Sequence, residues 1–421
     1  MNRFQEHVEF VRRHSPYYRE LYREVPSGCP EISRYPIVNQ QTFWQANEDF
    51  GRGVLTADYK SGIVFKSGGT SGNPKYSFFT AREWDSFTAV SGWGFTHNGV
   101  KEGDRIANLF YAGELYASFI YVTDLVKSSD VGITFPISGQ TPVETSVAMM
   151  KKLGINVLAG VPTTFMKIIS YLQQHPELRP EIELILFGGE PFYEDQLRSI
   201  ASTFPRARVH SILYASVDGG ELGFFDAKSC ENGEHRCFDQ STIMEIVEED
   251  TLEVITEQNR PGKLLVTNLE RRLMPLIRYP VGDVAMWTEP AGSPNRRFKL
   301  MGRSQEGARI GPATLYVQDV VAVIEHFHDQ VSLLNFQLII THHDKKDQAL
   351  IRIVPETMPE NKGELGEQML AYLYQERSML RDLVEQGLIH PLELQWCRPD
   401  ELESNPRTGK TRRVLDRRLD G

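Results

Sequence analysis

The sequence has few cysteines and no apolar leader at its start. Its 421 residues include only four cysteines, which is too few for a disulfide scaffold in a chain of this length. The first residues carry charge and lack the apolar core of a signal peptide. The longest apolar stretch, 106–123, is interrupted by polar residues and is better interpreted as a buried strand leading into a helix than as a membrane span. We therefore expect a soluble, reduced, cytoplasmic protein.

Acidic residues outnumber basic residues in the chain. The chain has 46 Lys and Arg against 56 Asp and Glu, a formal net charge of −10. This balance disfavours a general binder of nucleic acid or of anionic membranes, so we expect neither as a partner. It leaves room for a local basic site for a phosphate-bearing ligand, and the two local exceptions to the acidic average are Lys75 and the segment 407–418. At about 150 residues per domain, the length predicts two or three domains.

The pattern of apolar residues predicts an α/β fold. Between 60 and 215, short aliphatic runs alternate with longer amphipathic stretches, which is typical of a largely parallel sheet. Strands are expected at 63–66, 105–110, 133–135, 156–159, 184–187 and 208–213, and helices near 83–97, 142–152, 162–174 and 194–203. Pro162 would begin the third helix, and Thr80 with Glu83 has the spacing of a capping box for the first.

The pattern of apolar and turn residues changes after about residue 220. From 224 to 300, turn residues separate strand-like runs, which predicts a β-rich subdomain. The last stretch of about 120 residues has the size of a compact α+β domain. We expect in it a strand pair near 332–340 and 348–354 and one long helix near 364–385.

The sharpest local feature is the run KSGGTSGNPK at 66–75. Its glycines let backbone N–H groups turn toward an anion, its hydroxyls add donors and Lys75 adds charge, which is the composition of a phosphate cradle. The spacing differs from that of a P-loop, because Pro74 separates the last glycine from the lysine. On composition alone, a flexible turn between two strands stays open.

This run resembles the S-G-T-T-G-x-P-K signature of the AMP-forming adenylate synthetases, and the other signatures of that superfamily follow in order. The segments that resemble them are 188–191 (adenine segment), 214–218 (Y-G-x-[ST]-E), 277–283 (Y-R-T-G-D), 302–304 (domain hinge) and 408–413 (lysine motif). Within the superfamily, 14–18, 189–192, 230–246 and 409–416 resemble the phenylacetate–CoA ligase-like branch.

The resemblance implies both a fold and an activity. The fold would be a large N-terminal α/β adenylate-forming portion with a β-rich subdomain, residues 1–302, and a small mobile C-terminal α+β domain, 303–421, carrying the catalytic lysine. The activity would be ATP- and Mg²⁺-dependent activation of an aromatic carboxylic acid to an acyl-adenylate, followed by transfer to CoA or to a carrier thiol. Two alternatives stay open: adenylation of a phenazine-type aryl acid in antibiotic biosynthesis with transfer to a non-CoA acceptor, and a degenerate member that only binds nucleotide. The oligomeric state also stays open, a dimer being one candidate.

The resemblance also implies three groups of site residues. Lys410 would reach the α-phosphate and the carboxylate oxygens, and Asp218 would hold Mg²⁺; Asp283 would bind both ribose hydroxyls and Arg303 would assist near the ribose. The nucleotide-binding set is Ser67, Gly68, Gly69, Thr70, Ser71, Gly72, Lys75, Gly188, Gly189, Glu190, Tyr214, Ala215, Ser216, Asp283 and Arg303. The acid-binding set is Phe110, Tyr111, Tyr116, Gly160, Val161 and Pro162, whose aromatics favour a flat, apolar acid.

Two segments depart from the family pattern. Asp218 stands where the family has Glu, which makes the carboxylate one methylene shorter, and Val217 stands at the usual hydroxyl position. Thr70 or Ser216 would then supply the hydroxyl. In relatives the segment after the hinge lines the pantetheine channel, and Pro312 removes a backbone donor there. Adenylation is therefore better supported than thioester formation.

Two clusters of metal-ligating residue types remain. Cys230, His235 and Cys237 could bind zinc, although their spacing is not that of a standard finger, and plain structural or surface thiols are the alternative. The cluster at 342–344, His-His-Asp, lies beside a Lys-rich turn and is interpreted as a solvated loop.

Overall fold

The computed structural model describes residues 2–48, 53–67, 75–189, 192, 194–248, 251–303, 307–331, 333–355, 357–398, 401–403 and 411–418. These residues form two compact units. Unit 1 contains the described parts of 1–192 and 197–301, and unit 2 contains those of 302–421 together with 194–196. Among the helices of the described residues, none has both the length and the apolar character that a membrane crossing requires.

The centre of unit 1 is a five-stranded sheet in which all neighbouring strands are parallel, in the order β4-β3-β5-β6-β7. The strands are β3 (Arg105–Asn108), β4 (Ile133–Pro136), β5 (Val157–Gly160), β6 (Leu184–Phe187) and β7 (Arg208–Ser211). Every residue of the central strands β5 and β6 is buried, because helices cover both faces of the sheet. The predicted α/β fold with a parallel sheet is confirmed.

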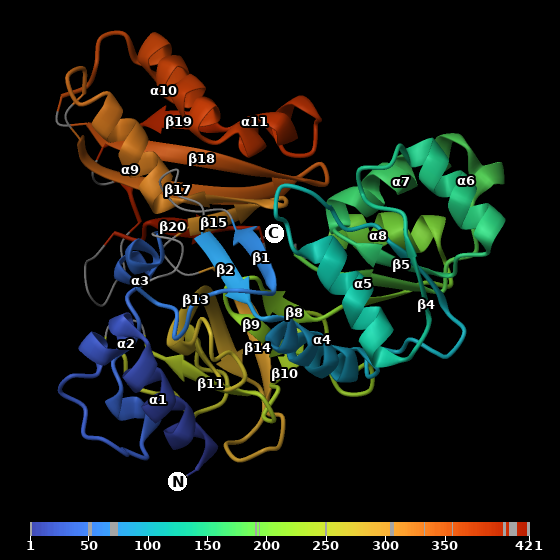
Figure 1. Cartoon of the computed structure of the whole chain (residues 1–421). Coiled ribbons are helices and arrows are strands. Elements are labelled where there is room, and N and C mark those ends of the chain that lie inside the picture. The colour runs from blue at the N-terminus through green and yellow to red at the C-terminus, as the bar shows by residue number, and fades with distance from the viewer. Residues whose placement is uncertain are drawn as a thin grey trace. The chain divides into compact units, whose positions relative to one another are not determined.

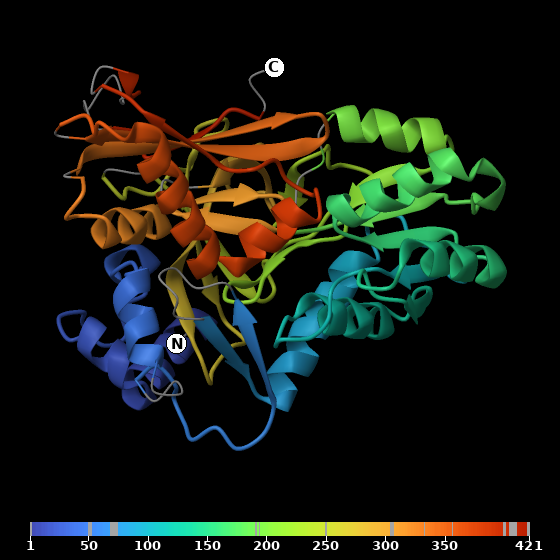
Figure 2. The same cartoon turned by 90° about the horizontal axis from the view of Figure 1, so that it is seen from above.

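Two groups of helices cover this sheet (Figures 1 and 2). On one face lie α4 (Ala81–Phe95) and α5 (Ser118–Ser129), and on the other α6 (Val143–Leu153), α7 (Pro162–Gln174), the short η3 (Pro176–Leu178) and α8 (Glu194–Thr203). Pro162 is the first residue of α7, as predicted. Thr80 and Glu83 form the predicted capping box, the Thr80 hydroxyl accepting from the Glu83 backbone N–H at 3.1 Å. These local signals were strong enough to set the helix starts.

The strand predicted at 63–66 does not join the parallel sheet. Among the described strands, β1 (Ile63–Ser67) pairs with β2 (Lys75–Phe79) alone, in an antiparallel ladder that places Ser67 opposite Lys75. The glycine-rich segment 68–74, which stands between these strands in the chain, lies outside the described residues.

The β-rich subdomain predicted at 224–300 is a five-stranded antiparallel sheet, in the order β10-β14-β13-β12-β11. Its strands are β10 (Glu234–Arg236), β11 (Thr242–Val247), β12 (Gly262–Asn268), β13 (Leu276–Trp287) and β14 (Arg297–Arg303). A short hairpin of β8 (Tyr214–Ser216) and β9 (Gly220–Gly223) stands between it and the parallel sheet in the chain.

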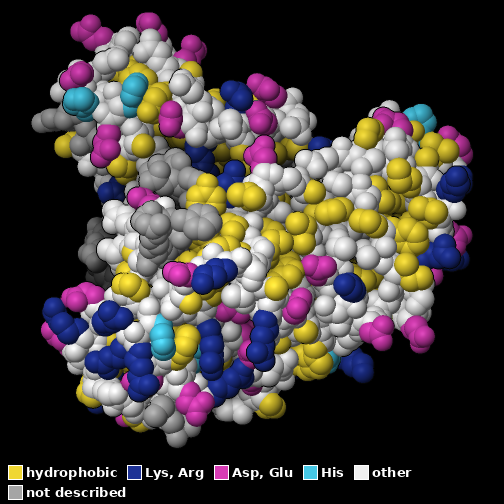
Figure 3. All heavy atoms as spheres, in the orientation of Figure 1, with side chains coloured by type: hydrophobic (Ala, Val, Ile, Leu, Met, Phe, Trp, Pro, Cys, Tyr) yellow, Lys and Arg dark blue, Asp and Glu magenta, His cyan; other side chains and the backbone are white. Residues whose placement is uncertain are grey.

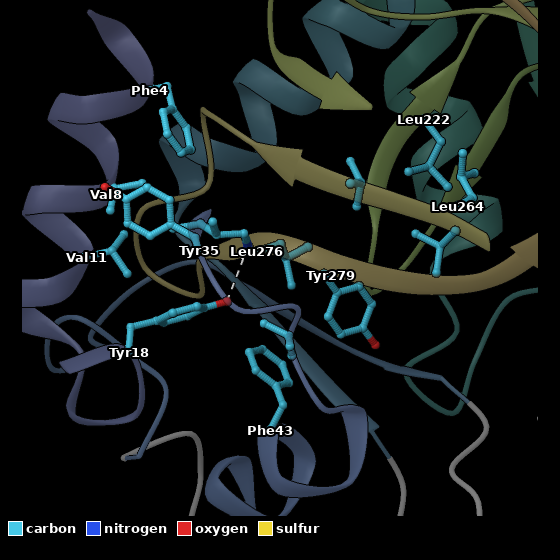
Figure 4. Packing of buried hydrophobic residues seen from close by; sticks show 14 of the residues in the cluster. Phe4, Val8, Val11, Tyr18, Tyr35, Phe43, Leu222, Leu264, Leu276 and Tyr279 are labelled. Carbon is cyan, nitrogen blue, oxygen red and sulfur yellow. Dashed lines mark hydrogen bonds between the residues drawn. The ribbon is translucent and has the colours of Figure 1, made fainter. Parts of the chain in front are cut away.

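The N-terminal helices complete the core of this subdomain. They are α1 (Arg3–His14), α2 (Pro16–Leu21), the 3-10 turn η1 (Ile32–Arg34) and α3 (Gln40–Asn47), and their aromatic side chains pack onto β13 (Figure 4). The Tyr18 hydroxyl donates to the Pro275 carbonyl at 2.9 Å. Arg278 of β13 forms a buried ion pair with Glu245 at 3.0 Å and donates to the Tyr35 carbonyl at 2.7 Å. Buried hydrogen bonds thus fix these helices to the sheet.

Basic side chains gather on one part of unit 1. Figure 3 shows Lys and Arg crowded over α1 and α2, whose last turns carry Arg12, Arg13 and Arg19. The net charge of −10 is therefore an average over an uneven surface.

Unit 2 contains a four-stranded mixed sheet, in the order β19-β18-β17-β20, and a small hairpin. The strands are β15 (Gly307–Ile310), β16 (Ala313–Tyr316), β17 (Leu333–His343), β18 (Lys346–Pro355), β19 (Glu393–Trp396) and β20 (Val414–Asp416). The helices α9 (Val317–His326), α10 (Lys362–Glu376) and α11 (Ser378–Glu385) pack their apolar side chains against alternate residues of β17 and β18. Side chains alternate between the faces of a strand, so the helices cover one face.

The single helix expected near 364–385 is wrong. The chain forms two helices, because Arg377 leaves the helical conformation at φ −124° and ψ 63°. The Arg377 guanidinium donates to Asp319 at 3.1 Å and to the Thr314 carbonyl at 2.7 Å, which holds this residue at the break.

Candidate functional site

The carboxyl ends of the parallel strands bring several predicted site residues together. Phe110 and Tyr111 follow β3, Gly160 ends β5, and Gly188 follows β6. The Gly188 N–H donates to the Gly160 carbonyl at 3.2 Å, which extends the ladder beyond the strands. In open α/β sheets, ligands bind outside this edge. The acid-binding and adenine segments predicted from the sequence therefore lie at one edge of one sheet.

Gly188 is required for close packing at this edge. A Cβ atom here would lie 2.9 Å from Cγ2 of Ile212 and 3.6 Å from Cζ of Phe110. The next residue, Gly189, has φ +80°, a conformation that favours glycine. Both glycines of the adenine segment thus have backbone reasons to be glycine, and Gly188 seats that segment against Phe110.

The six residues predicted to bind the acid divide by exposure. Phe110, Gly160, Val161 and Pro162 are buried. Tyr111 is half-buried, with its hydroxyl 3.4 Å from Oγ1 of Thr164, and Tyr116 is 37% exposed. Only the two tyrosines of the set therefore present substantial side-chain surface in this conformation.

A hydrogen bond joins two of the signature segments. The Tyr214 hydroxyl, from β8, donates to Oδ2 of Asp283 in β13. The two residues are 69 positions apart in the chain, and both are partly exposed. The bond fixes the Asp283 carboxylate through one oxygen and leaves the group in contact with solvent.

A second hydrogen bond joins Asp218 to the same strand. The Tyr279 hydroxyl donates to Oδ2 of Asp218 at 2.9 Å and accepts from Nε1 of Trp44 at 3.1 Å. The Tyr279 ring packs in the core beside Phe43 while its hydroxyl points out of the cluster (Figure 4). A rigid aromatic residue thus carries a polar group from the core to the carboxylate predicted to hold the metal.

The turn that carries Asp218 is held by further bonds. The Ser216 hydroxyl accepts from the Gly219 N–H at 2.7 Å, and the Asp218 carbonyl accepts from Nη1 of Arg271 at 3.0 Å. Arg271 is buried, and this burial lowers its pKa although nearby carboxylates act in the opposite direction. Ala215 lies in the same hairpin, partly buried. Asp218 therefore stands on a constrained turn with its carboxylate partly exposed.

Glu221, which sequence analysis did not select, lies three residues beyond Asp218 and is 1% exposed. Its Oε2 accepts from Nδ2 of Asn268 at 3.0 Å, and burial raises the pKa of its carboxyl above the usual range. A buried carboxyl with a raised pKa is a poor ligand for a hydrated cation. Of the two acids, Asp218 is the one that can meet a metal.

Lys75 is tied to the same assembly. Its ammonium donates to Oε1 of Gln40 at 3.2 Å and lies 5.3 Å from the centre of the Trp44 ring. The Gln40 amide donates in turn to the Pro280 carbonyl at 2.5 Å. Helix α3 therefore links the lysine after the glycine-rich segment to the strand that carries Asp283 and Tyr279.

Sequence analysis missed Gln40, Trp44 and Tyr279 as parts of this site. Tyr279 stands inside the segment that resembles Y-R-T-G-D, and that position was its only signal. Gln40 and Trp44 lie about 240 residues earlier in the chain, and no local pattern connects them to it.

Several predicted residues lie outside the described part of the chain: Gly68, Gly69, Thr70, Ser71, Gly72, Glu190 and Lys410. The side chains of Ser67 and Arg303 also lie outside it. The roles assigned to these nine residues stay predictions.

Two residues of unit 2, Glu403 and Arg412, are held together. They stand before and after segment 404–410, which contains Lys410 and lies outside the described residues. Gln337 of β17 is fully buried, and its amide nitrogen donates to the Glu403 carbonyl at 3.0 Å and to the Arg412 carbonyl at 2.8 Å. Its amide oxygen accepts from the Glu403 N–H at 3.3 Å, and the Arg412 N–H donates to the Glu403 carbonyl at 3.0 Å. One side chain thus joins Glu403 to Arg412, which stand before and after segment 404–410 in the chain.

The zinc alternative for Cys230, His235 and Cys237 is wrong. Among the described residues, the one group of three or more metal-ligating side chains that converge is His343, Asp344 and His390. His235 is buried, its Nε2 lies 2.8 Å from the Ser211 hydroxyl, and burial lowers its pKa to about 3. Burial likewise raises the pKa of the Cys237 thiol, which contacts Sδ of Met244 at 3.6 Å. His235 and Cys237 therefore belong to the core.

The interpretation of 342–344 as a solvated loop is wrong for its first residue. His342 is 6% exposed and its Nδ1 lies 2.7 Å from Oδ1 of Asp347, which is also buried. Only His343 and Asp344 are exposed.

Comparison with known proteins yields relatives along the whole chain. No family model matches the sequence. It is 22% identical to the phenylacetate–coenzyme A ligase of Thermus thermophilus, in a match that covers 98% of this chain and 94% of the relative. It is 26% identical over 254 residues to the indoleacetate–lysine synthetase of Pseudomonas savastanoi, and this match spans only 59% of each chain.

A solved structure supports the fold. The 2-hydroxyisobutyryl-CoA ligase, in complex with 2-HIB-AMP and CoA, superimposes with a TM-score of 0.75 over 99% of this chain and 88% of that one. The two sequences are 18% identical, so this likeness concerns the fold alone.

Proposed function

We propose that this chain is an ATP-dependent ligase that activates a carboxylic acid as its acyl-adenylate and transfers the acyl group to a thiol such as CoA. It belongs to the AMP-forming adenylate synthetase superfamily and to its phenylacetate–CoA ligase-like branch. The observation that carries the proposal is the convergence of three signature segments in unit 1. Tyr214 donates a hydrogen bond to Asp283, and Tyr279 donates one to Asp218. Gln40 accepts from Lys75 and donates to the Pro280 carbonyl of β13, the strand that contains Tyr279 and Asp283.

The chemistry requires positioning and charge neutralisation. A carboxylate oxygen of the acid attacks the α-phosphorus of ATP, the bond to the bridging oxygen of the β-phosphate breaks, and pyrophosphate leaves with that electron pair. The thiolate then attacks the acyl carbon and AMP leaves. No step needs a covalent bond to the protein, so cations and N–H donors supply the catalysis.

Each predicted residue has a task in this reaction. Lys75 and residues 67–72 hold the β- and γ-phosphates, Gly188 to Glu190 and residues 214–216 enclose the base, and Asp283, assisted by Arg303, holds the ribose. Lys410 places a cation at the α-phosphate as charge builds there. The bond from Tyr214 orients the Asp283 carboxylate, which is partly exposed and would accept from the ribose hydroxyls.

The donor set at Asp218 fits Mg²⁺. This ion is held in proteins by one or two carboxylates together with substrate phosphates and water, so a single partly exposed carboxylate suffices. The Tyr279 hydroxyl bonds Oδ2 and orients the carboxylate that would hold the ion or its water. Bound there, the ion would neutralise phosphate charge.

We further propose that the acid is aromatic. Tyr111 and Tyr116 offer aromatic faces beside the strand edge, and two relatives are named for arylacetates, indoleacetate and phenylacetate. An amine acceptor is the second candidate, because one relative is named a synthetase that joins indoleacetate to lysine. All four cysteines are free thiols, which agrees with a reducing cytoplasm that supplies ATP and CoA.

Acid-dependent exchange of pyrophosphate into ATP tests the proposal. A panel of phenylacetate, benzoates, indole acids and phenazine carboxylates should contain at least one acid that supports exchange without CoA. AMP release with CoA, with lysine or with neither then separates the thiol acceptor from the amine acceptor. Lys410→Ala should abolish exchange and leave ATP affinity nearly unchanged, whereas the control Lys362→Ala, an exposed lysine of the same unit, should not. Measurable ATP binding without exchange for any acid would instead support the degenerate alternative.

A further inference from the structure

Three metal-ligating side chains meet at the end of a hairpin in unit 2. Asp344 and Lys345 join β17 to β18 with φ values of +48° and +66°, the left-handed pair that a tight two-residue hairpin requires. His343 ends β17, and His390 comes from the segment between α11 and β19. These side chains come from stretches of chain that are 47 residues apart.

The three side chains converge at ligand distance. One ligand atom from each of His343, Asp344 and His390 lies within 4.8 Å of the others. The two imidazole rings are stacked, with centres 4.0 Å apart and planes 17° from parallel, so a shared ion requires one ring to turn about its side-chain bonds until both lone pairs meet. Oδ2 of Asp344 lies 3.4 Å from Nδ1 of His343.

Neighbouring oxygens fix which nitrogen of each ring carries a proton. Nε2 of His343 lies 2.9 Å from Oε1 of Gln348, and Nε2 of His390 lies 3.1 Å from the His343 carbonyl oxygen. Neither oxygen can donate, so both Nε2 atoms are N–H donors, and Nδ1 of each ring is the atom that would bind an ion once it carries no proton. Nε2 of Gln348 donates to Glu393 at 2.7 Å, which holds its oxygen toward His343. An oxygen acceptor on the second nitrogen is the usual support of a metal-binding histidine.

The backbone under the cluster is anchored from inside unit 2. The His390 N–H donates to the Asp347 carbonyl at 2.9 Å. The buried Asp347 carboxylate accepts from His342 at 2.7 Å, from Arg418 at 2.8 Å and from the Gly311 N–H at 2.9 Å. Burial would raise the pKa of this carboxyl, but its bond to His342 and the Arg418 charge bring it below its usual range. The backbone of Asp347 therefore holds His390 beside the hairpin, and the carboxylate of Asp347 fixes that backbone to the interior of unit 2.

We infer that His343, Asp344 and His390 form a surface binding site for one divalent transition-metal ion. Two imidazole nitrogens and one carboxylate oxygen suit Zn²⁺ and Cu²⁺, and water completes the coordination because His343 and Asp344 are exposed. The ion would bridge the hairpin and the segment before β19. This inference is independent of the proposed ligase activity, since all of its residues lie in unit 2 and none is assigned to the reaction.

Metal titration of the full chain tests the site. After dialysis against EDTA, ZnCl₂ is added in a calorimeter to the Cys230→Ser chain, which lacks the one cysteine that is not buried. We expect one equivalent to bind. His390→Gln and His343→Gln should each weaken binding at least 10-fold, and Gln348→Leu should weaken it less, through the lost support of His343. The matched control is His328→Gln, an exposed histidine 3.2 Å from Asp329 in the same unit.

Spectroscopy identifies the ligands directly. With one equivalent of Cu²⁺, the electron paramagnetic resonance spectrum should show coupling to two imidazole nitrogens, and His390→Gln should reduce this to one. Equal melting temperatures in EDTA would show that the variants fold. Unchanged zinc affinity in both histidine variants, or an unchanged copper spectrum, would overturn the inference.

Discussion

Replacing Gln337 by methionine should weaken the link between Glu403 and Arg412 without leaving a cavity in the core. Methionine has nearly the volume of glutamine but cannot donate to the Glu403 and Arg412 carbonyls or accept from the Glu403 N–H. Each of these three bonds contributes about 0.5–1.5 kcal/mol, so the free energy of unfolding should fall by about 1.5–4.5 kcal/mol. The Arg412 to Glu403 backbone bond remains, so these two residues should stay joined but be held less firmly.

The functional effect follows from the position of Lys410 in the chain, between Glu403 and Arg412. Displacement of a catalytic group by about 1 Å costs about 100-fold in rate, so kcat for pyrophosphate exchange should fall 10- to 100-fold. The KM for ATP should stay within threefold, because the residues proposed to hold the β- and γ-phosphates and the ribose, apart from Arg303, lie before residue 302. Hydrogen exchange, read by mass spectrometry, should quicken in the peptide that contains 411–417.

The control separates positioning from general instability. Ile351→Ala removes a buried side chain of β18 and should destabilise unit 2 by about 2–5 kcal/mol without removing any hydrogen bond of Gln337. If Ile351→Ala and Gln337→Met lose activity equally, the effect is loss of folding. Wild-type kcat in Gln337→Met would refute the positioning role of Gln337.

Three further predictions concern unit 1. Asp283→Ala should raise the KM for ATP at least 10-fold in the exchange assay, and a wild-type ATP dependence would remove Asp283 from the ribose site. Tyr279→Phe loses the bond to Asp218 and should lower exchange kcat about fivefold or more while metal-free ATP binding is unchanged; equal kcat would separate Tyr279 from catalysis. Burial, aided by the charges of Arg272 and Arg3, lowers the pKa of His7 to about 4. The unfolded chain therefore binds the extra proton as pH falls from 6.5 to 4, and the free energy of unfolding should drop by about 3 kcal/mol over that range; urea titrations should show a smaller drop in His7→Leu than in the exposed control His14→Leu.

Local signals in the sequence predicted the parallel sheet well. The runs at 184–187 and 162–174 match β6 and α7 residue for residue, because β6 is buried at every position and α7 begins at a proline. The capping box at Thr80 placed the start of α4. Such features depend on neighbours within a few positions, and one sequence suffices to read them.

The errors and omissions come from contacts between distant residues. The break at Arg377 depends on Asp319, 58 positions away, and an apolar repeat that continues through 364–385 gives no sign of it. The burial of His342 depends on the network around Asp347 and Arg418. In the candidate site, the order of signature segments predicted Tyr214, Asp218 and Asp283, whereas Gln40 and Trp44 acquire their place only through folding.

The anchoring of the N-terminal helices on β13 has a consequence for how the chain folds. Tyr18 and Pro275 are 257 positions apart in the chain. The N-terminal helices are therefore synthesised early but can dock only after β13, one of the last strands of unit 1, has been synthesised. Such long-range closure slows folding, while the parallel sheet between them can form from nearer contacts. The same geometry suggests that residues 1–48, added as a separate peptide, would complement a chain that begins at 53. Recovery of activity on mixing would measure how much of this docking needs a covalent link.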